Sequence, residues 1–312
     1  MRLALILDPL EQIKTYKDTS FAIMRAAALR GHELYVLQQS DVVLQSGTVL
    51  GYARRLEMHA DEKNWYALGE PAGTALSAFD AVLMRKDPPL DMEYMFSTYL
   101  LELAEAQGAR ILNKPSSIRD YNEKLAIAKF PQFMPPTLVT RQMALIRTFI
   151  SEQRDVIVKP LDGMGGAGIF RITAADPNLN VILETVTALG QRTVMAQRYI
   201  PEIAQGDKRI LIIDGAVVPF ALARIPKAGE TRGNLAAGGR GVAQALSARD
   251  REIAETLGPV LKAAGLFLVG LDVIGDYLTE VNVTSPTGMQ EIAAQSGFDV
   301  AGMLVDALER TC

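Results

Sequence analysis

The sequence predicts a protein of mixed α/β and α+β class, with an open α/β part first, a small α+β part next and an antiparallel sheet last. An apolar run at Leu3–Leu7, a helical pattern after Asp18 and a strand at Glu33–Leu37 follow one another as a β-α-β unit. Later strands flank Asp214-Gly215, a turn typical of antiparallel hairpins. The length of 312 residues exceeds that of one average domain.

The first part is expected to span residues 1–120. Its helix carries apolar residues on one face and ends at Gly31, since glycine readily adopts the conformation that closes a helix. Residues 40–78 show no clear pattern apart from a possible hairpin around Ser46-Gly47. A strand at Ala81–Met84, a helix over about 91–107 and a strand at 110–113 complete an open α/β domain.

The two later parts are expected at residues 121–203 and 204–312. The central part is assigned helices near 121–130, 142–152 and 178–189, and strands at 137–139, 155–160, 168–172 and 193–197. The last part is assigned strands at 209–213, 217–223, 267–274 and 278–284, and helices at 247–264 and 297–310. The change from one strand per helix to paired strands predicts an antiparallel C-terminal sheet.

Composition excludes several functions. The net charge of −4 gives no basic field for nucleic acid, and no apolar stretch is long enough to cross a membrane. A lone cysteine, Cys312, excludes a disulfide framework and favours a cytoplasmic location. With His32 and His59 as the only histidines, a His/Cys zinc site is excluded and a Ser-His-Asp triad is disfavoured.

A glycine-rich loop follows the apolar strand 155–160. Gly163, Gly165 and Gly168 match the dinucleotide-binding pattern, but the residues after Gly168 read as a strand where that pattern needs a helix. A strand-loop-strand hairpin instead predicts a flap whose N–H groups face phosphates, with Lys159 beside it. A tight turn without a ligand is the alternative for the loop, and an ordinary surface lysine is the alternative for Lys124.

A polar cluster is predicted on the hairpin of 267–284. Glu280 and Asn282 share one face of their strand. A two-residue loop at 275–276 would pair Asp272 with Thr279, whereas a three-residue loop would pair it with Glu280. In the second register, two carboxylates and an amide oxygen form a hard donor set suited to Mg²⁺. A solvent-facing polar stripe is the alternative.

These segments resemble the ATP-grasp superfamily and, within it, the bacterial glutathione synthetase family. The resemblance is carried by Met84–Pro89, Lys159–Gly166, Val194–Pro201, Gly229–Gly241 and Thr279–Pro286, which together extend over almost the whole chain. It implies the ATP-grasp fold, with an N-terminal α/β domain, a central lid domain and a C-terminal domain. It also implies an ATP-dependent ligase that joins γ-glutamylcysteine to glycine through an acyl phosphate, giving glutathione, ADP and phosphate.

The resemblance also implies roles for individual residues. ATP would be bound by Lys124, Lys159, Gly163, Met164, Gly165, Gly166, Gln197, Tyr199, Ile200 and Asp207. Mg²⁺, or Mn²⁺ in its place, would be held by Asp272, Glu280 and Asn282. Catalytic charge would come from Arg209, Arg224 and Arg232, and the substrate would meet Arg85, Arg209, Arg224, Asn282, Ser285 and Thr287. The glycines between Ile225 and Gly241 suit a lid, and the family forms homo-oligomers, often tetramers.

Other functions remain open from the residues alone. Another carboxylate-amine ligase, such as D-alanine–D-alanine ligase or an enzyme that adds glutamate to a protein tail, shares the fold, but Met84–Pro89 and Gly229–Gly241 argue against it. A nicotinamide-binding oxidoreductase would need a helix after Gly168. A regulatory nucleotide-binding module would be expected to lack the metal ligands, yet all three are present.

Overall fold

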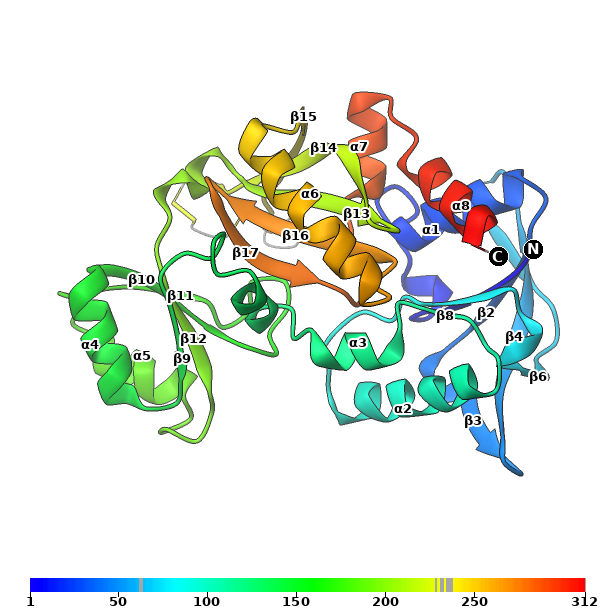
Figure 1. Cartoon of the computed structure of the whole chain (residues 1–312), viewed down its shortest axis with the longest axis horizontal. Coiled ribbons are helices and arrows are strands. Elements are labelled where there is room, and N and C mark those ends of the chain that lie inside the picture. The colour runs from blue at the N-terminus through cyan, green and yellow to red at the C-terminus, as the bar shows by residue number, and fades with distance from the viewer. Residues whose placement is uncertain (62–63, 228, 231–232, 234–237, 312) are drawn as a thin grey trace.

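The computed structural model describes residues 1–312 apart from 62–63, 228, 231–232, 234–237 and 312. Three sheets follow one another along the long axis (Figure 1), with the first and central sheets at the two ends and the last sheet between them. The chain therefore passes from one end of the molecule to the other and then returns to its middle.

The N-terminal sheet has the order β3-β4-β2-β1-β7-β8, and β5 and β6 also pair with β4. Its core strands β1, β2, β7 and β8 are parallel, as the β-α-β pattern predicted. The Asp18 carboxylate caps α1 by accepting from Phe21 N at 2.7 Å. The elements are β1 (Arg2–Ile6), α1 (Thr19–Leu29), β2 (Glu33–Leu37), β3 (Val42–Gln45), β4 (Thr48–Met58), β5 (Tyr66–Leu68), β6 (Ala72–Ala75), β7 (Ala81–Met84), α2 (Met92–Ala106), β8 (Ile111–Leu112) and α3 (Pro115–Asp120).

The central sheet has the order β11-β10-β12-β9, with every neighbouring pair antiparallel. Helices α4 and α5 pack on one face, where Ile146, Ile150 and Leu183 are buried against Val156 and Val158. The elements are β9 (Thr137–Thr140), α4 (Met143–Gln153), β10 (Asp155–Pro160), β11 (Phe170–Thr173), α5 (Leu179–Val186) and β12 (Val194–Arg198).

The C-terminal sheet has the order β15-β14-β13-β16-β17 and is antiparallel throughout. Helix α6 covers one of its faces (Figure 1). The elements are β13 (Asp207–Ile213), β14 (Ala216–Ile225), β15 (Arg240–Ala245), α6 (Ala248–Ala263), β16 (Leu268–Ile274), β17 (Tyr277–Asn282), α7 (Met289–Ser296) and α8 (Val300–Thr311).

The structure corrects the sequence assignment in three places. The helix expected near 121–130 is wrong, because α3 ends at Asp120 and only a short 3-10 turn, Leu125–Lys129, follows it. Strand β15 was not predicted and begins at Arg240, at the end of the glycine-containing stretch Ile225–Gly241 that was expected to form a lid, and α7 was not predicted. The hairpin around Ser46-Gly47 is confirmed, since β3 and β4 pair across it.

The hydrophobic cores cross the sheets. Leu3 and Leu5 of β1 share a core with Leu211 of β13 and with Leu304 and Leu308 of α8. The segment Tyr121–Met134 packs into the core of the C-terminal sheet. The division into three domains, with boundaries after residues 120 and 203, remains a prediction. Each predicted domain contains one sheet, but the hydrophobic cores are shared between the predicted domains. None of the helices in the described ranges has the length and apolar composition needed to cross a membrane.

Candidate functional site

A cavity of about 480 Å³ opens where the three sheets meet. The central sheet contributes Lys159 and Gln197, the C-terminal sheet contributes Arg209 and Glu280, and the N-terminal part contributes Lys17, among other residues. The site is therefore built by the tertiary fold from segments that lie far apart in the sequence.

The register of β16 and β17 decides how the predicted metal ligands lie. Ile274 pairs with Tyr277 across a two-residue turn, but the register shifts by one residue before Asp272, which pairs with Glu280. A β-bulge thus combines the short loop with the pairing expected from the longer one. Asp272, Glu280 and Asn282 all line the cavity, so the predicted cluster is brought together and a solvent-facing stripe is wrong.

Two buried arginines surround the Asp272 carboxylate. Arg209 is bidentate, with Nε 2.6 Å from Oδ1 and Nη2 3.2 Å from Oδ2, and Arg224 Nη2 lies 2.8 Å from Oδ2. Arg224 also pairs with the Asp207 carboxylate. Two guanidinium groups therefore balance two carboxylates in a place where an unpaired charge would be costly.

The two buried acids differ in how well they are satisfied. Burial alone would raise the pKa of Asp272, but the attraction of Arg209 and Arg224 outweighs it and holds this pKa below its usual range. For Asp207, burial dominates over the attraction of Arg224 and raises the pKa to about 7. Its Oδ1 atom is buried and has no hydrogen-bond partner among the described residues. This oxygen is free to accept a hydrogen bond from a ligand.

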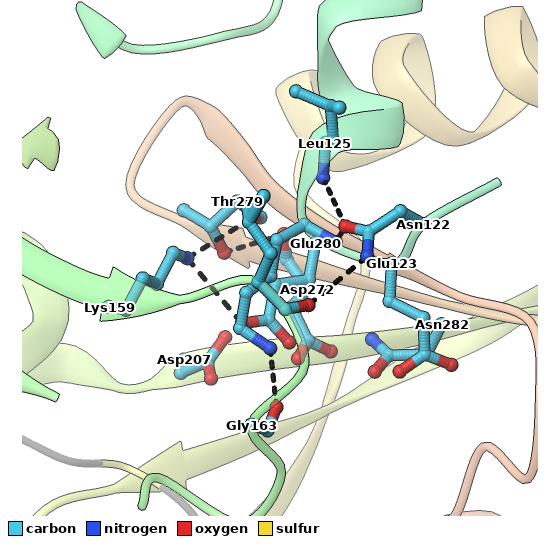
Figure 2. A network of polar contacts seen from close by, with 12 residues as sticks. Asn122, Glu123, Leu125, Lys159, Gly163, Asp207, Asp272, Thr279, Glu280 and Asn282 are labelled. Carbon is cyan, nitrogen blue, oxygen red and sulfur yellow. Dashed lines mark hydrogen bonds and ion pairs between the residues drawn. The ribbon is translucent and has the colours of Figure 1, made fainter. Parts of the chain in front are cut away.

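Two lysines converge on Glu280, and Figure 2 shows one of them, Lys159. Lys159 Nζ lies 3.4 Å from Glu280 Oε1 and 3.4 Å from the Thr279 carbonyl oxygen, and Lys124 Nζ lies 3.8 Å from Glu280 Oε1. Lys124 also donates to the Gly163 carbonyl oxygen at 2.6 Å. Both lysines are at least 95% buried, so the reading of Lys124 as a surface lysine is wrong.

The donor set of the hairpin fits a divalent cation that also contacts phosphates. No three His, Cys, Asp or Glu side chains within the described ranges converge as a self-contained metal cluster. Glu280 offers a carboxylate, and Asn282 donates its amide nitrogen to Gly270 O at 3.1 Å, which leaves its amide oxygen as an acceptor. Mg²⁺ commonly takes one or two carboxylates together with substrate oxygens, so these residues fit it.

The glycine loop bends as a flap over this end of the cavity. Gly165, Gly166 and Gly168 have positive φ values of 62°, 84° and 70°, which favour glycine. Strand β11 follows the loop and runs antiparallel to β10. The nicotinamide-dinucleotide reading is therefore wrong, because no helix opens at these glycines.

The remaining predicted residues fall in three places. Gln197, Tyr199 and Ile200 line the cavity at the end of β12, and Ser285 and Thr287 line it from the loop after β17. Arg85 does not line the cavity: its Nε donates to Ser20 Oγ and its Nη2 to Pro286 O, both at 3.1 Å. Arg232 lies outside the described residues.

Glu123 is a site residue that the sequence analysis did not single out. Its Oε1 accepts from Val283 N, Thr284 N and Thr284 Oγ1 at 2.8–3.1 Å, and its backbone oxygen accepts from Val281 N. It thereby fastens the segment that carries Lys124 to the strand that carries Glu280. Only its position next to Lys124 in the sequence could have indicated that Glu123 belongs to the site.

Comparison with known proteins identifies relatives over the whole chain. Residues 1–119 match the model of the prokaryotic glutathione synthetase N-terminal domain, and residues 123–297 match that of the prokaryotic glutathione synthetase ATP-grasp domain. A glutathione synthetase of Nitrosomonas europaea is 62% identical, with 99% of this chain and 98% of the relative covered. One of Shewanella oneidensis is 54% identical at the same coverage of 99% and 98%.

Solved structures agree on the fold at much lower identity. The crystal structure of the D-cycloserine synthetase DcsG has a TM-score of 0.69 at 18% identity, with both chains fully covered. The ATP-grasp ligase PsnB in complex with a minimal precursor, Mg and ADP has a TM-score of 0.63 at 17% identity, covering 99% of this chain and 97% of PsnB. The ATP-grasp fold expected from the sequence is thereby confirmed.

Proposed function

The chain belongs to the prokaryotic glutathione synthetase family and is an ATP-dependent ligase that forms glutathione, and from this premise we propose how its cavity does so. The substrates are γ-glutamylcysteine, glycine and ATP. The cysteinyl carboxylate attacks the γ-phosphorus of ATP and ADP leaves. The glycine amine then attacks the acyl carbon of the resulting acyl phosphate, phosphate leaves, and the nitrogen loses a proton.

ATP lies between the central and C-terminal sheets. The loop of Gly163, Met164, Gly165 and Gly166 covers the phosphates, and Lys124 and Lys159 neutralise them, since both lysines already meet at Glu280. The adenine lies against Gln197, Tyr199 and Ile200 at the end of β12. The unpartnered Oδ1 of Asp207 accepts a hydrogen bond from a ribose hydroxyl.

Asp272, Glu280 and Asn282 would hold Mg²⁺, with Mn²⁺ as an alternative ion. When bound, such an ion polarises phosphoryl oxygens and offsets the charge that develops during transfer. The chain's own part is to keep the hairpin in register through the bulge before Asp272 and to fix β17 through the Glu123 backbone oxygen, which accepts from Val281 N. This keeps the hard oxygen ligands on the same wall as the lysines.

The arginines serve the acid that becomes phosphorylated. Arg209 and Arg224 line the cavity beside Asp272, where their guanidinium groups match a carboxylate or a phosphoryl group bidentately. Arg232 would add a third cation from the segment between β14 and β15. Asn282, Ser285 and Thr287 lie along the dipeptide, and Arg85 acts on it by holding the loop at Pro286.

The observation that carries this proposal is the convergence of Lys124, Lys159 and Glu280 under the glycine loop. The test is a phosphate-release assay with ATP, Mg²⁺ and γ-glutamylcysteine. We expect Glu280→Gln to lower turnover by at least about 100-fold, because it would remove a carboxylate ligand of the ion that offsets the developing charge, and the loss of one such electrostatic contribution costs about that much. Glu255→Gln, an exposed change on α6, is the matched control and should leave turnover unchanged.

Two outcomes would contradict the assignment. Turnover of Glu280→Gln equal to that of the control, with an unchanged circular dichroism spectrum, would remove Glu280 from the site. Phosphate release with D-alanine but not with glycine as the acceptor would favour the D-alanine–D-alanine ligase reading instead. We also propose a cytoplasmic homotetramer, in line with the family resemblance, which light scattering coupled to gel filtration would test.

A further inference from the structure

A second cavity, of about 650 Å³, lies behind the stretch of chain against which the adenine is placed. Arg198, Tyr199 and Ile200 line both this cavity and the one that holds the proposed site. These three residues, which we call the adenine wall, follow one another at the end of β12 and separate the two cavities. With a cavity behind it, the wall has no packed layer of side chains to support it, so individual contacts must hold it in place.

Arg171 of β11 holds the ring of Tyr199. The guanidinium carbon lies 3.7 Å from the centroid of that ring, which is a cation–π contact. The Asp155 carboxylate fixes the guanidinium in turn, accepting from Nε at 3.0 Å and from Nη2 at 2.6 Å. Tyr199 N also donates to the backbone oxygen of Asp155 at 2.9 Å. Asp155 therefore holds both members of the pair, one through its side chain and the other through its backbone.

Tyr277 holds the neighbouring side chain of the wall. Arg198 Nη2 donates to Tyr277 Oη at 2.8 Å, and the Arg198 guanidinium carbon lies 5.4 Å from the centroid of the Tyr277 ring. Tyr277 begins β17, the strand that carries Glu280, so this pair joins the wall to the hairpin of the C-terminal sheet. Neither Arg171 nor Tyr277 lines the first cavity, so both act on the wall from outside the site.

We propose that Arg171 and Tyr277 are positioning residues for the nucleotide. Each keeps its partner in the adenine wall in the position that binds the base. This inference rests on the proposed function, and within it on the place given to the adenine. A wall released from either pair occupies its binding position for only a fraction of the time, and the apparent affinity for ATP falls by that fraction. The phosphate end has its own lysines, so the loss is confined to the base.

The test compares ATP with inorganic tripolyphosphate, which carries the phosphates without the base. Tripolyphosphate is measured with Mg²⁺ as a competitive inhibitor against ATP. Arg171→Met should raise the KM for ATP about 3- to 10-fold, the range of a partly exposed cation–π contact, and leave the Ki of tripolyphosphate unchanged. Arg171→Lys keeps a cation over the ring and should recover part of the loss. Tyr277→Phe removes one hydroxyl and should raise the KM for ATP by a similar factor, again with an unchanged Ki.

The kcat and the KM for γ-glutamylcysteine should stay at wild-type values in all of these variants. Arg147→Met is the matched control. Arg147 also belongs to the central part and donates one hydrogen bond, to Asn180 at 3.1 Å, but it lines neither cavity. Every constant of this control should match that of the wild type.

Two results would overturn the positioning role. An unchanged KM for ATP in Arg171→Met or in Tyr277→Phe would remove that residue from the proposal. A Ki of tripolyphosphate that rises together with the KM for ATP would show that the change acts on the glycine loop or on the whole fold. Tyr199→Ala, which removes a ring from the wall itself, should also raise the KM for ATP. If it does not, the proposed place of the adenine is overturned as well.

Discussion

Replacing Asp207 by asparagine tests which of the two buried acids holds a proton. Asp272 receives three charge-assisted contacts from two arginines, whereas Asp207 receives its guanidinium contact from Arg224 and keeps one oxygen unpartnered. Asp207 is therefore the acid whose charged form is less well compensated. Its pKa in the folded protein is about 7, against an ordinary value of 3.8.

The sign and size of the effect follow from this difference. A raised pKa means that the folded state binds a proton which the unfolded state releases, so the stabilisation is complete below 3.8 and is lost as the pH rises to about 7. Between pH 3.8 and pH 7 the free energy of unfolding loses about 4 kcal/mol from this group, and about 2 to 3 kcal/mol of that loss falls between pH 5 and pH 7. Asp207→Asn has no such proton, so its stability relative to wild type should rise by that amount across the interval.

The assay is thermal unfolding of both proteins at pH 5, 6, 7 and 8, read as a difference in Tm. The expected change between pH 5 and pH 7 is about 5 to 10 °C, from ~2–4 °C per kcal/mol for a chain of this size class. Glu255→Gln, an exposed change on α6 that leaves Asp207 in place, is the control, and its Tm difference from wild type should be flat from pH 5 to pH 8. A flat difference for Asp207→Asn, or a slope for Glu255→Gln, would refute the reasoning.

Two further predictions concern the phosphate end. Gly165→Ala places an alanine at φ +62° with open space around it, so it should cost about 1–2 kcal/mol of backbone strain and raise the KM for ATP. Gly47→Ala is the control: it lies at φ +82° with open space in a remote hairpin, so it should cost as much stability and leave the KM for ATP unchanged. Equal KM values in the two variants would contradict a phosphate-covering loop. Lys159→Met should weaken ATP binding about 10- to 100-fold in calorimetry. Lys129→Met removes an exposed lysine and should leave the affinity for ATP unchanged. Similar affinities in the two variants would show that Lys159 does not contact the nucleotide.

Much of the fold could be predicted because its signals are local. The strands Glu33–Leu37, Ala81–Met84 and 155–160 have the predicted bounds, since each is an apolar run between turn residues. The turn at Asp214-Gly215 was also predicted from a local signal, because the Asp-Gly pair is typical of hairpin turns. Strand β15 was missed because its sequence, RGVAQA, has little apolar content and is held by pairing with β14.

The candidate site could be predicted only where its residues lie close in sequence. Asp272, Glu280 and Asn282 share one hairpin, and the remaining uncertainty was its register, which a β-bulge at a single position decides. Arg85 was expected at the substrate from the family resemblance and its residue type, yet in the structure it is buried against Ser20 and Pro286 and does not line the cavity.

The contacts between cations and acids explain how so polar a site stays folded before its substrates arrive. Lys124 and Lys159 meet Glu280, and Arg209 and Arg224 meet Asp272, so neither the cations nor the acids are left buried and alone. When a triphosphate binds with a divalent ion, the two lysines exchange the Glu280 carboxylate for phosphate oxygens, which are also negative. Glu280 exchanges the lysines for the divalent cation, which is also positive. Binding therefore exchanges partners without stranding a charge, which lets buried lysines and carboxylates form a ready site and stabilise the empty protein as well.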